Sequence, residues 1–340
     1  MAYDNDAAKA ELVRTLRISR QAILLVGSGI SLTVGYPSWP RLLDQLQQQI
    51  IPESPFPAGL EDLLQRASFV RTTLEGFPNA VDRRRQYRDY FEHNFGPRNP
   101  NFAPLHRTLI QLPVCGIVTT NYDPVLESAI TSVRVAAGLS ACTSIDACAN
   151  HRHRVFRFLR GLSSDGDIAS VLHLHGFWEH PEGIILTSEN YAERYGLRAS
   201  ADPAAGDPLT APARPLDTFH RKVVWSLLTT RPVMFVGFSV EDPAFQLMLS
   251  FVHDDFDLAP NPAAHFAVLP SDPEDGEQRD RDAARLAGFG VHPVFYDITV
   301  DDAGNRSHGR LVELIEELAG SIGTPTTPGI SGLSRRMLAR

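Results

Sequence analysis

The sequence contains little cysteine. Its 340 residues include three cysteines, Cys115, Cys142 and Cys148. An odd number with no CxxC spacing excludes a disulfide framework and a structural zinc ribbon. Cys142 and Cys148 lie near His151 and His153, so a metal site is one interpretation, but the spacing matches no common zinc pattern and favours a polar loop. We therefore expect no metal.

Long apolar runs and an excess of positive charge are also absent. No run approaches the length of about 18 residues that a membrane-spanning helix needs. The first residues, MAYDNDAAKAELVRTL, are polar and periodic, unlike a secretory leader. The net charge is −8, whereas proteins that bind nucleic acid without sequence preference usually carry a basic domain or a basic patch. We expect a cytoplasmic protein with no membrane contact and no direct nucleic-acid binding.

Several common catalytic signatures are missing. The sequence has no GxSxG nucleophile elbow, no HExxH pair and no P-loop lysine. These absences exclude a serine hydrolase of the elbow type, a zinc protease of the HExxH type and a P-loop ATPase.

Short, continuously apolar runs alternate with helical patterns along the chain. They occupy residues 22–27, 115–119, 171–174, 183–186, 233–236, 266–269 and 294–296. Apolar strands of this length, separated by helices, are typical of a parallel sheet that is covered on both faces. The sequence therefore predicts an α/β fold with a doubly wound, mostly parallel, Rossmann-like sheet.

The remaining segments predict one domain over residues 1–321 with a helical insertion. An amphipathic helix is expected over residues 5–20, and the insertion covers about residues 41–111. Residues 199–215, rich in Ala and Pro, predict a mobile loop, and residues 322–340 a flexible tail. Within the insertion the expected helices are residues 41–50, 60–73, 81–94 and 104–111.

A glycine-rich turn follows the first predicted strand. Residues 27–31 read Gly-Ser-Gly-Ile-Ser, and small residues let backbone N–H groups approach a diphosphate. Glycine also serves tight turns that bind nothing. Polar clusters at 119–123, 173–176 and 236–239 each end another apolar strand. Because ligands of open parallel sheets bind beyond the carboxyl ends of the strands, four loops are expected to meet in one crevice.

Two of these clusters carry candidate catalytic residues. The amide of Asn121 can orient a water or a ribose hydroxyl, although a helix cap or Asx turn explains it equally, and Asp123 has the same two interpretations. Alternation places His173 and His175 on one face of their strand. His175, at the strand end before Gly176, suits a general base, whereas His173 suits a structural role.

The last cluster offers polar contacts to a ligand. Ser239, two residues after Gly237, has small neighbours and could bond a phosphate or a ribose hydroxyl. Glu241 and Asp242 are expected to be first-turn carboxylates of the next helix.

Together these motifs resemble the sirtuin signature. VGSGISLTVGYPSW at residues 26–39 is similar to its GAGxS turn, TNYD at 120–123 to its QNID element, HLHG at 173–176 to its catalytic HG, and VGFS at 236–239 to its GTS element. They occur in the family's order over residues 20 to about 300. TTNYD, LHLHG and LTSENY at 186–191 look most like the sirtuin-like proteins of bacterial antiphage defence.

The departures from the family's protein deacylases are specific. The deacylases carry a four-cysteine zinc module after the catalytic histidine, and this chain has no cysteine between His175 and Gly237. Their GIPDFR segment is GYPSWP here, at residues 35–40, without the arginine. The resemblance therefore favours hydrolysis of NAD+ itself over deacylation of a peptide.

The resemblance implies an NAD+ glycohydrolase that releases nicotinamide and ADP-ribose without a metal. Asn121 would orient the ribose and the attacking water, and His175 would accept a proton. The residues expected to bind NAD+ are Gly27, Ser28, Gly29, Ser31, Asp123, Gly237 and Ser239. An NAD or ADP-ribose sensor without turnover and an NAD-dependent deacylase are the alternatives.

The resemblance also implies regulation, since unrestrained NAD+ hydrolysis would kill the host. We expect an abortive-infection effector that forms a homo-oligomer or responds to a separate activating protein, such as an ATPase or a nucleic-acid-guided sensor. Asp44, about twenty positions after the glycine turn, favours the unphosphorylated ribose of NAD over NADP.

Overall fold

The computed structural model describes most of the chain. The described residues are 3–98, 101–149, 151–162, 167–199, 209–210, 218–238, 240, 242–255, 265–300 and 306–323. Most of the predicted loop at 199–215, the predicted tail beyond residue 323, and Ser239 lie outside these ranges.

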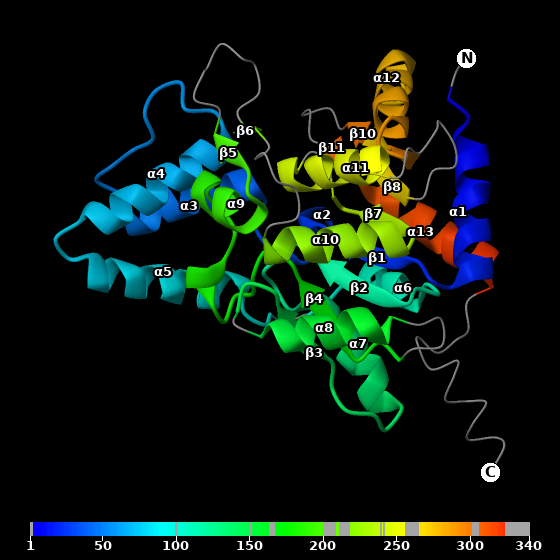
Figure 1. Ribbon diagram of the computed structural model, residues 1–340, viewed down its shortest axis with the longest axis horizontal. Coiled ribbons are helices and arrows are strands. Elements are labelled where there is room, and N and C mark those ends of the chain that lie inside the picture. Colours follow the sequence, from blue (N-terminus) through cyan, green and yellow to red (C-terminus); the bar gives the residue numbers. More distant parts are fainter. Residues whose placement is uncertain are drawn as a thin grey trace.

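A seven-stranded parallel sheet forms the centre of the molecule (Figure 1). The strands run in the order β3-β4-β2-β1-β7-β8-β9. Their bounds are β1 Ile23–Val26, β2 Gly116–Thr119, β3 Thr143–Asp146, β4 Ser170–His173, β7 Val233–Val236, β8 His265–Ser271 and β9 Val291–Asp297. Two small antiparallel pairs join β5 Arg198–Ala199 to β6 Leu209–Thr210 and β10 Thr299–Val300 to β11 Arg306–Ser307. The predicted doubly wound α/β fold is confirmed.

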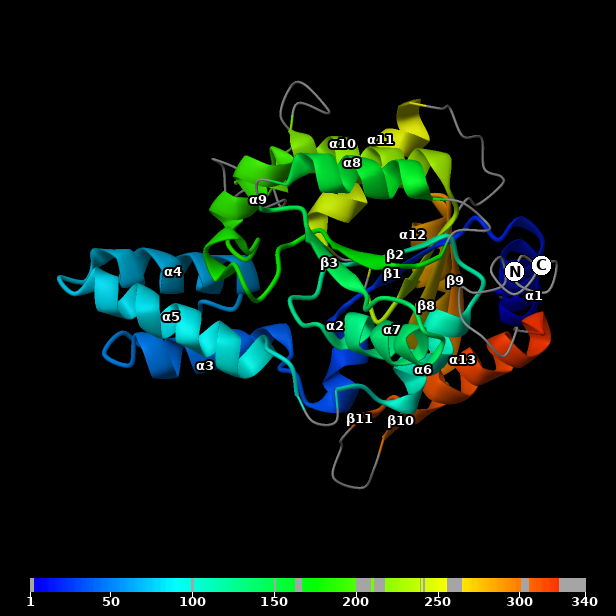
Figure 2. The ribbon, with the colours of Figure 1, turned by 90° about the horizontal axis from the view of Figure 1, so that it is seen from below.

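The helices cover both faces of the sheet (Figure 2). On one face lie α8 Arg152–Gly161, α10 Phe219–Thr230, α11 Pro243–Asp255 and α12 Gly276–Ala287. On the other lie α1 Asn5–Ser19, α6 Pro104–Gln111, α7 Val125–Ala136 and α13 Gly309–Ile322. Strand side chains alternate between the two resulting cores: Ile23 and Leu25 enter the first, and Leu24 and Val26 the second. Burial on both faces explains why the strands read as continuous apolar runs.

A third group of helices stands at one end of the molecule, on the left of Figure 1. It consists of α3 Trp39–Ile50, α4 Leu63–Gly76 and α5 Ala80–Phe95. Three of the four helices expected over residues 41–111 therefore pack together, whereas α6 packs in the layer of α7 and α13. An aromatic contact joins the group to the sheet domain: the ring of Tyr122, after β2, lies 6.0 Å from Phe91 and 5.5 Å from Phe95 between centroids.

Four short helical segments connect these layers to the site. They are α2 Ser28–Ser31, the 3-10 turns Leu32–Val34 and Pro181–Gly183, and α9 Ser188–Tyr195.

Two strands differ from the sequence prediction. The strand expected over residues 183–186 is wrong: a 3-10 turn ends at Gly183, and Ile184 and Leu186 pack into the core of the α3–α5 group. These residues are apolar because they fill that core rather than the sheet. The edge position is taken instead by β3, which the sequence did not reveal because, of its residues Thr-Ser-Ile-Asp, only Ile145 is apolar.

The order of the strands creates a switch point at the centre of the sheet. From β1 the chain builds β2, β3 and β4 on one side, and it then returns to place β7, β8 and β9 on the other. The connection leaving β1 reaches α6 on one face, and the connection leaving β7 reaches α11 on the opposite face. Diverging connections of this kind open a crevice at the carboxyl ends of the two strands.

Within the described ranges, no helix combines the length and apolar character needed to cross a bilayer.

Phe91 allows a test of the aromatic contact between the α3–α5 group and the sheet domain. Its side chain is fully buried and meets Tyr87, Tyr90, Phe95 and Tyr122. We expect Phe91→Ala to lower the free energy of unfolding by about 3–5 kcal/mol, because the cavity it leaves lies among rigid rings. Urea denaturation measures the loss. The control Phe156→Ala, on a side chain that is 59% exposed, should change it by less than about 0.5 kcal/mol; equal effects would contradict the prediction.

Candidate active site at the sheet switch point

A cavity of about 710 Å³ lies at the carboxyl ends of β1, β2, β4 and β7. The loops after these strands bring together six of the predicted site residues: Ser28, Ser31, Asn121, Asp123, His175 and Gly237. Helices α3 and α4 complete the wall with apolar side chains, among them Trp39, Leu42 and Leu63. A cavity of this size, mostly apolar with a few convergent polar groups, is typical of small-molecule sites.

The glycines of the β1 turn serve the close approach of two loops. Gly27 N–H donates to Val236 O at 2.9 Å, and Gly29 N–H donates to Gly237 O at 3.0 Å. A Cβ on Gly27 would lie 2.3 Å from Gly237 O, and Gly237 itself has φ +64°. Gly27 and Gly29 are not among the residues that line the cavity, whereas Ser28 and Ser31 are. The glycines thus position the two serines that line the cavity.

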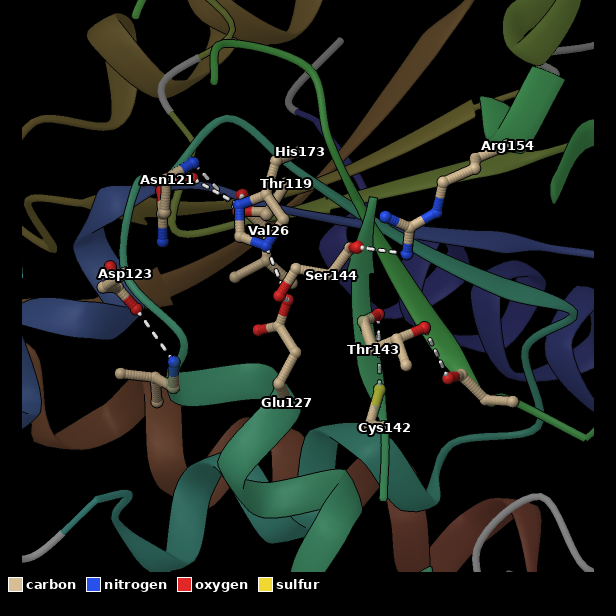
Figure 3. Close-up of polar contacts among 12 residues, drawn as sticks. Val26, Thr119, Asn121, Asp123, Glu127, Cys142, Thr143, Ser144, Arg154 and His173 are labelled. Atoms are coloured by element: carbon tan, nitrogen blue, oxygen red, sulfur yellow. Dashed lines mark hydrogen bonds and ion pairs between the residues drawn. The ribbon is translucent and has the colours of Figure 1, made fainter. Parts of the chain in front are cut away.

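Asn121 is fixed by hydrogen bonds to the turn after β1 and to the end of β2, and Figure 3 shows its bond to Thr119. Its Nδ2 donates to Gly27 O at 3.1 Å and to Ser31 Oγ at 2.9 Å, and its backbone N–H donates to Thr119 Oγ1 at 3.0 Å. Both amide protons are therefore used, and the side-chain oxygen remains as the free group. Among the described residues, Asn121 Oδ1 is buried and has no hydrogen-bond partner.

Asp123 both caps a helix and faces the cavity. Its Oδ1 accepts the N–H of Val125, the first residue of α7, at 3.2 Å. Burial raises the pKa of Asp123 to about 6, and hydrogen bonds from Ser31 and Val125 oppose that rise. The two interpretations of this residue, as a cap and as a ligand contact, are compatible in the structure.

His175 follows β4 and is held by aromatic rings. Its ring lies 5.6 Å from Tyr191 and 5.7 Å from Tyr195 between centroids, at steep angles. Burial lowers the pKa of His175 below its ordinary value, and the charge of Asp242 opposes this shift only in part. The imidazole is therefore neutral at pH 7. Its Nε2 is buried and, within the described part of the chain, makes no hydrogen bond.

His173 has a different environment two residues earlier. It is fully buried, its Nδ1 lies 2.8 Å from the backbone oxygen of Asn121, and its Nε2 lies 2.6 Å from Glu127 Oε1 (Figure 3). Burial acts to lower the pKa of His173, but the charge and hydrogen bond of Glu127 outweigh it and the pKa is raised. The structural role that the sequence suggested for His173 agrees with these contacts.

Two further polar residues, Asp242 and Tyr191, line the cavity and contact each other. Asp242 lies immediately before α11 and not in its first turn as expected, and it accepts the N–H groups of Ala244 and Phe245. Glu241 lies outside the described residues. Asp242 also accepts a hydrogen bond from the hydroxyl of Tyr191. Tyr191 lies in the LTSENY segment, so the sequence marked the segment without revealing this pair.

Other candidate residues lie apart from the cavity. Asp44 forms an ion pair with Arg66 and is not among the lining residues. Cys142 precedes β3 and Cys148 follows it. Across the described ranges there is no group of three or more His, Cys, Asp or Glu side chains placed to hold a metal ion.

The loop contact at Gly27 can be tested by adding one methyl group. We expect Gly27→Ala to lower the free energy of unfolding by about 1–3 kcal/mol, because the Cβ meets backbone atoms that have no room to move aside. Gly76→Ala is the matched control, since no atom lies within 4 Å of a Cβ there. Chemical denaturation of both variants decides the matter, and a Gly27→Ala protein as stable as the control would refute the packing role.

The raised pKa of Asp123 predicts a pH-dependent stability. A carboxyl with a raised pKa binds its proton more tightly in the folded protein, so its stabilising contribution is full below pH 3.8 and is lost as pH rises to about 6. Relative to Asp123→Asn, the wild-type free energy of unfolding should fall by about 3 kcal/mol at most over this window. Urea denaturation at several pH values measures the difference. Asp82→Asn, at an exposed position of α5, serves as the control, and parallel curves for wild type and Asp123→Asn would contradict the prediction.

The chain is similar to several known proteins. A family model described as "SIR2-like domain" matches residues 116–294. Two curated relatives, each named NAD(+) hydrolase ThsA, come from Bacillus cereus (strain MSX-D12) and Enterococcus faecium. The Bacillus cereus protein is 24% identical over 71% of this chain and 41% of its own length. The Enterococcus faecium protein is 22% identical over 73% of this chain and 43% of its own length. The chain thus spans about two fifths of their length.

One solved structure, titled as a crystal structure of a Sir2 homolog–NAD complex, matches with 13% identity and a TM-score of 0.35 over 92% of this chain and 93% of that one. The family predicted from the four motifs is confirmed by the model that spans residues 116–294. The chain belongs to the family of SIR2-like domains.

Proposed function

We propose that this protein is an NAD+ glycohydrolase that cleaves the bond between nicotinamide and ribose, giving nicotinamide and ADP-ribose. One observation carries the proposal. Asn121 and His175 line the same cavity at the switch point of a SIR2-like domain, and each keeps a buried polar atom without a partner among the described residues. Buried polar atoms normally have a hydrogen-bond partner. Two such atoms without a partner, on residues that line one cavity, therefore indicate that a ligand supplies the missing partners. The relatives named NAD(+) hydrolase support the choice of substrate.

The hydrogen bonds of Asn121 limit what it can do. Because its Nδ2 protons are donated to Gly27 and Ser31, its remaining capacity is that of an acceptor. It can hold the proton of a ribose hydroxyl or of an attacking water, and it cannot donate to the diphosphate. In the proposed reaction Asn121 therefore orients the nucleophile or the ribose.

His175 has the protonation state that a general base requires. Burial keeps its pKa below the ordinary value, so the neutral form predominates at pH 7. In that form it can accept a proton from water or from a ribose hydroxyl as the glycosidic bond breaks. The rings of Tyr191 and Tyr195 fix the orientation of the imidazole.

The charges around the cavity suit a substrate whose reacting end is positive. Asp123 and Asp242 line it, and both can face positive charge that develops on the ribose and that the pyridinium carries before cleavage. We assign the nicotinamide carboxamide to Asp123. The lining residues within the described ranges include no Lys or Arg. The diphosphate then depends on Ser28, Ser31 and backbone groups near Gly237, with Ser239 proposed to assist. A wall without cations also favours NAD over NADP, whose extra phosphate normally meets an arginine.

The biological role extends the proposal beyond the reaction. We infer an effector of antiphage defence that depletes NAD+ when triggered, through self-assembly or through a separate activating protein. The α3–α5 group forms one wall of the cavity, so access of NAD+ depends on helices that lie outside the sheet layers.

Turnover of NAD+ by the purified protein tests the proposal. We expect nicotinamide and ADP-ribose to form. We expect His175→Ala to lower kcat by about 10²–10⁴-fold, the usual contribution of a general base, and Asn121→Ala to lower it by about 10²-fold, because the ribose or the water loses its orientation. Products are separated by chromatography at several protein concentrations. Asn94→Ala on α5 and His292→Ala on β9, two positions that do not line the cavity, are controls that should retain activity.

The outcomes separate the alternatives. Full activity in Asn121→Ala or His175→Ala would remove the proposed mechanism. Binding of NAD+ without turnover at every concentration would favour a sensor module, and turnover only with an acetyl-lysine peptide would favour a deacylase.

A further inference from the structure

A buried ion pair lies next to the site and outside the cavity wall. His173, at the end of β4, and Glu127, in the first turn of α7, meet through Nε2 and Oε1 at 2.6 Å (Figure 3). Their side chains are 0% and 8% exposed, and neither residue lines the cavity. Charged groups at such depth are costly unless they are paired and hydrogen-bonded. The pair therefore needs a reason beyond filling the core.

The contacts of His173 show where its protons are. The backbone oxygen of Asn121 can only accept, so the Nδ1 that lies 2.8 Å away carries a proton and donates it. The other nitrogen faces the carboxylate of Glu127, which also accepts from Ser144 Oγ at 2.7 Å. Glu127 thus fixes the ring in the orientation that presents Nδ1–H to Asn121.

The charged groups around His173 support the same proton arrangement. Asp123, after β2, adds a negative charge that raises the pKa of His173 together with Glu127. Asp146, which pairs with His173 in the β3–β4 register, is engaged with the N–H groups of Cys148 and Ala149 and with His180. The described surroundings hold carboxylates on three segments and favour a ring that donates from Nδ1.

The hydrogen bond from His173 holds the one backbone group of Asn121 that its other contacts leave open. Asn121 uses its N–H toward Thr119 and its amide toward Gly27 and Ser31. The carbonyl is held by His173. A catalytic group must be kept within about 0.5 Å of its working position, and that precision comes from the residues behind it.

We propose that His173, oriented by Glu127, is a positioning residue that fixes the peptide of Asn121 and thereby the side-chain oxygen that acts on the substrate. This inference rests on the proposed NAD+ hydrolysis. It assigns a task to the first histidine of HLHG and to a glutamate that no motif marked. The competing explanation is that the pair only stabilises the fold.

Two double variants separate these explanations. Glu127→Gln with His173→Asn removes both charges but keeps an amide N–H near the place of Nδ1. Glu127→Gln with His173→Leu removes the charges and also the donor, and Leu has nearly the shape of Asn. The readouts are kcat and KM for NAD+, with the melting temperature of each protein measured beside them.

A positioning role predicts a loss in kcat that follows the donor. The Asn-containing variant should stay within about threefold of wild type, and the Leu-containing variant should lose about 10–100-fold in kcat with little change in KM. His106→Leu is the control for lost stability, because His106 is fully buried in α6 and bonds only to the N–H of Ala103 among the described residues. Equal kcat in the two double variants, or a loss that His106→Leu reproduces at the same melting temperature, overturns the proposal.

Failure to fold and failure of the proposed function are handled separately. Should the Leu-containing variant not fold, His173→Asn is compared with His173→Gln. Asn places its N–H near the position of Nδ1 and Gln places it near that of Nε2, so equal kcat in these two variants overturns the proposal.

A wild-type protein that binds NAD+ without turnover refutes the proposed hydrolase activity. Positioning is then judged by the dissociation constant of NAD+, which should be larger for the Leu-containing variant than for the Asn-containing variant. Equal dissociation constants, or no NAD+ binding by wild type, overturn the positioning role as well.

Discussion

The close approach of the loops after β1 and β7 is the constraint on which the site depends. Backbone hydrogen bonds from Gly27 to Val236 and from Gly29 to Gly237 hold two loops whose chains then leave for opposite faces of the sheet. A Cβ at Gly27 would overlap the backbone of Gly237, and a Cβ at Gly29 would lie 3.1 Å from it. Ser28, Ser31 and Asn121 are placed by this contact, since the amide of Asn121 bonds to Gly27 and Ser31. The cavity is therefore a product of backbone packing before it is a product of side chains.

The surroundings of His173 and His175 shift the pKa values of these two histidines in opposite directions. His173 and His175 are both buried, yet the pKa of the first is raised and that of the second is lowered. The difference comes from Glu127, which meets His173 directly, whereas His175 is surrounded mainly by aromatic rings. The surroundings therefore bind His173 to Glu127 and to the backbone of Asn121, and they leave His175 as the histidine that lines the cavity.

Most of the sheet and much of the site were predictable from the sequence, for physical reasons that also explain the failures. Strands buried on both faces are continuously apolar, so β1, β2, β4 and β7 to β9 were visible, and parallel strands forced their polar ends to one edge. The edge strand β3 is half exposed and carries no such signal. Residues 183–186 gave a false signal because an apolar run indicates burial of any kind: Ile184 and Leu186 are buried against the α3–α5 group and Ile185 in the core on one face of the sheet.

Side-chain partners were less predictable than positions. Asn121, Asp123 and His175 reach the cavity as expected, but the bond of His173 to Glu127 and that of Tyr191 to Asp242 join residues 46 and 51 positions apart. No local pattern encodes such pairs. The extent of the single domain, the limits of the insertion and the roles of the site residues stay predictions.

The aromatic contact at Tyr122 has a mechanical consequence. Tyr122 lies between Asn121 and Asp123, and its ring packs against Phe91 and Phe95 of α5 while its hydroxyl bonds to Ile185 O. Its backbone oxygen also accepts from Trp178 N–H. Any displacement of α5 is therefore passed to a residue that is covalently joined to Asn121 and Asp123, two of the polar residues that line the cavity. The α3–α5 group thus reaches the cavity in two ways, directly through lining side chains such as Phe95 and indirectly through Tyr122.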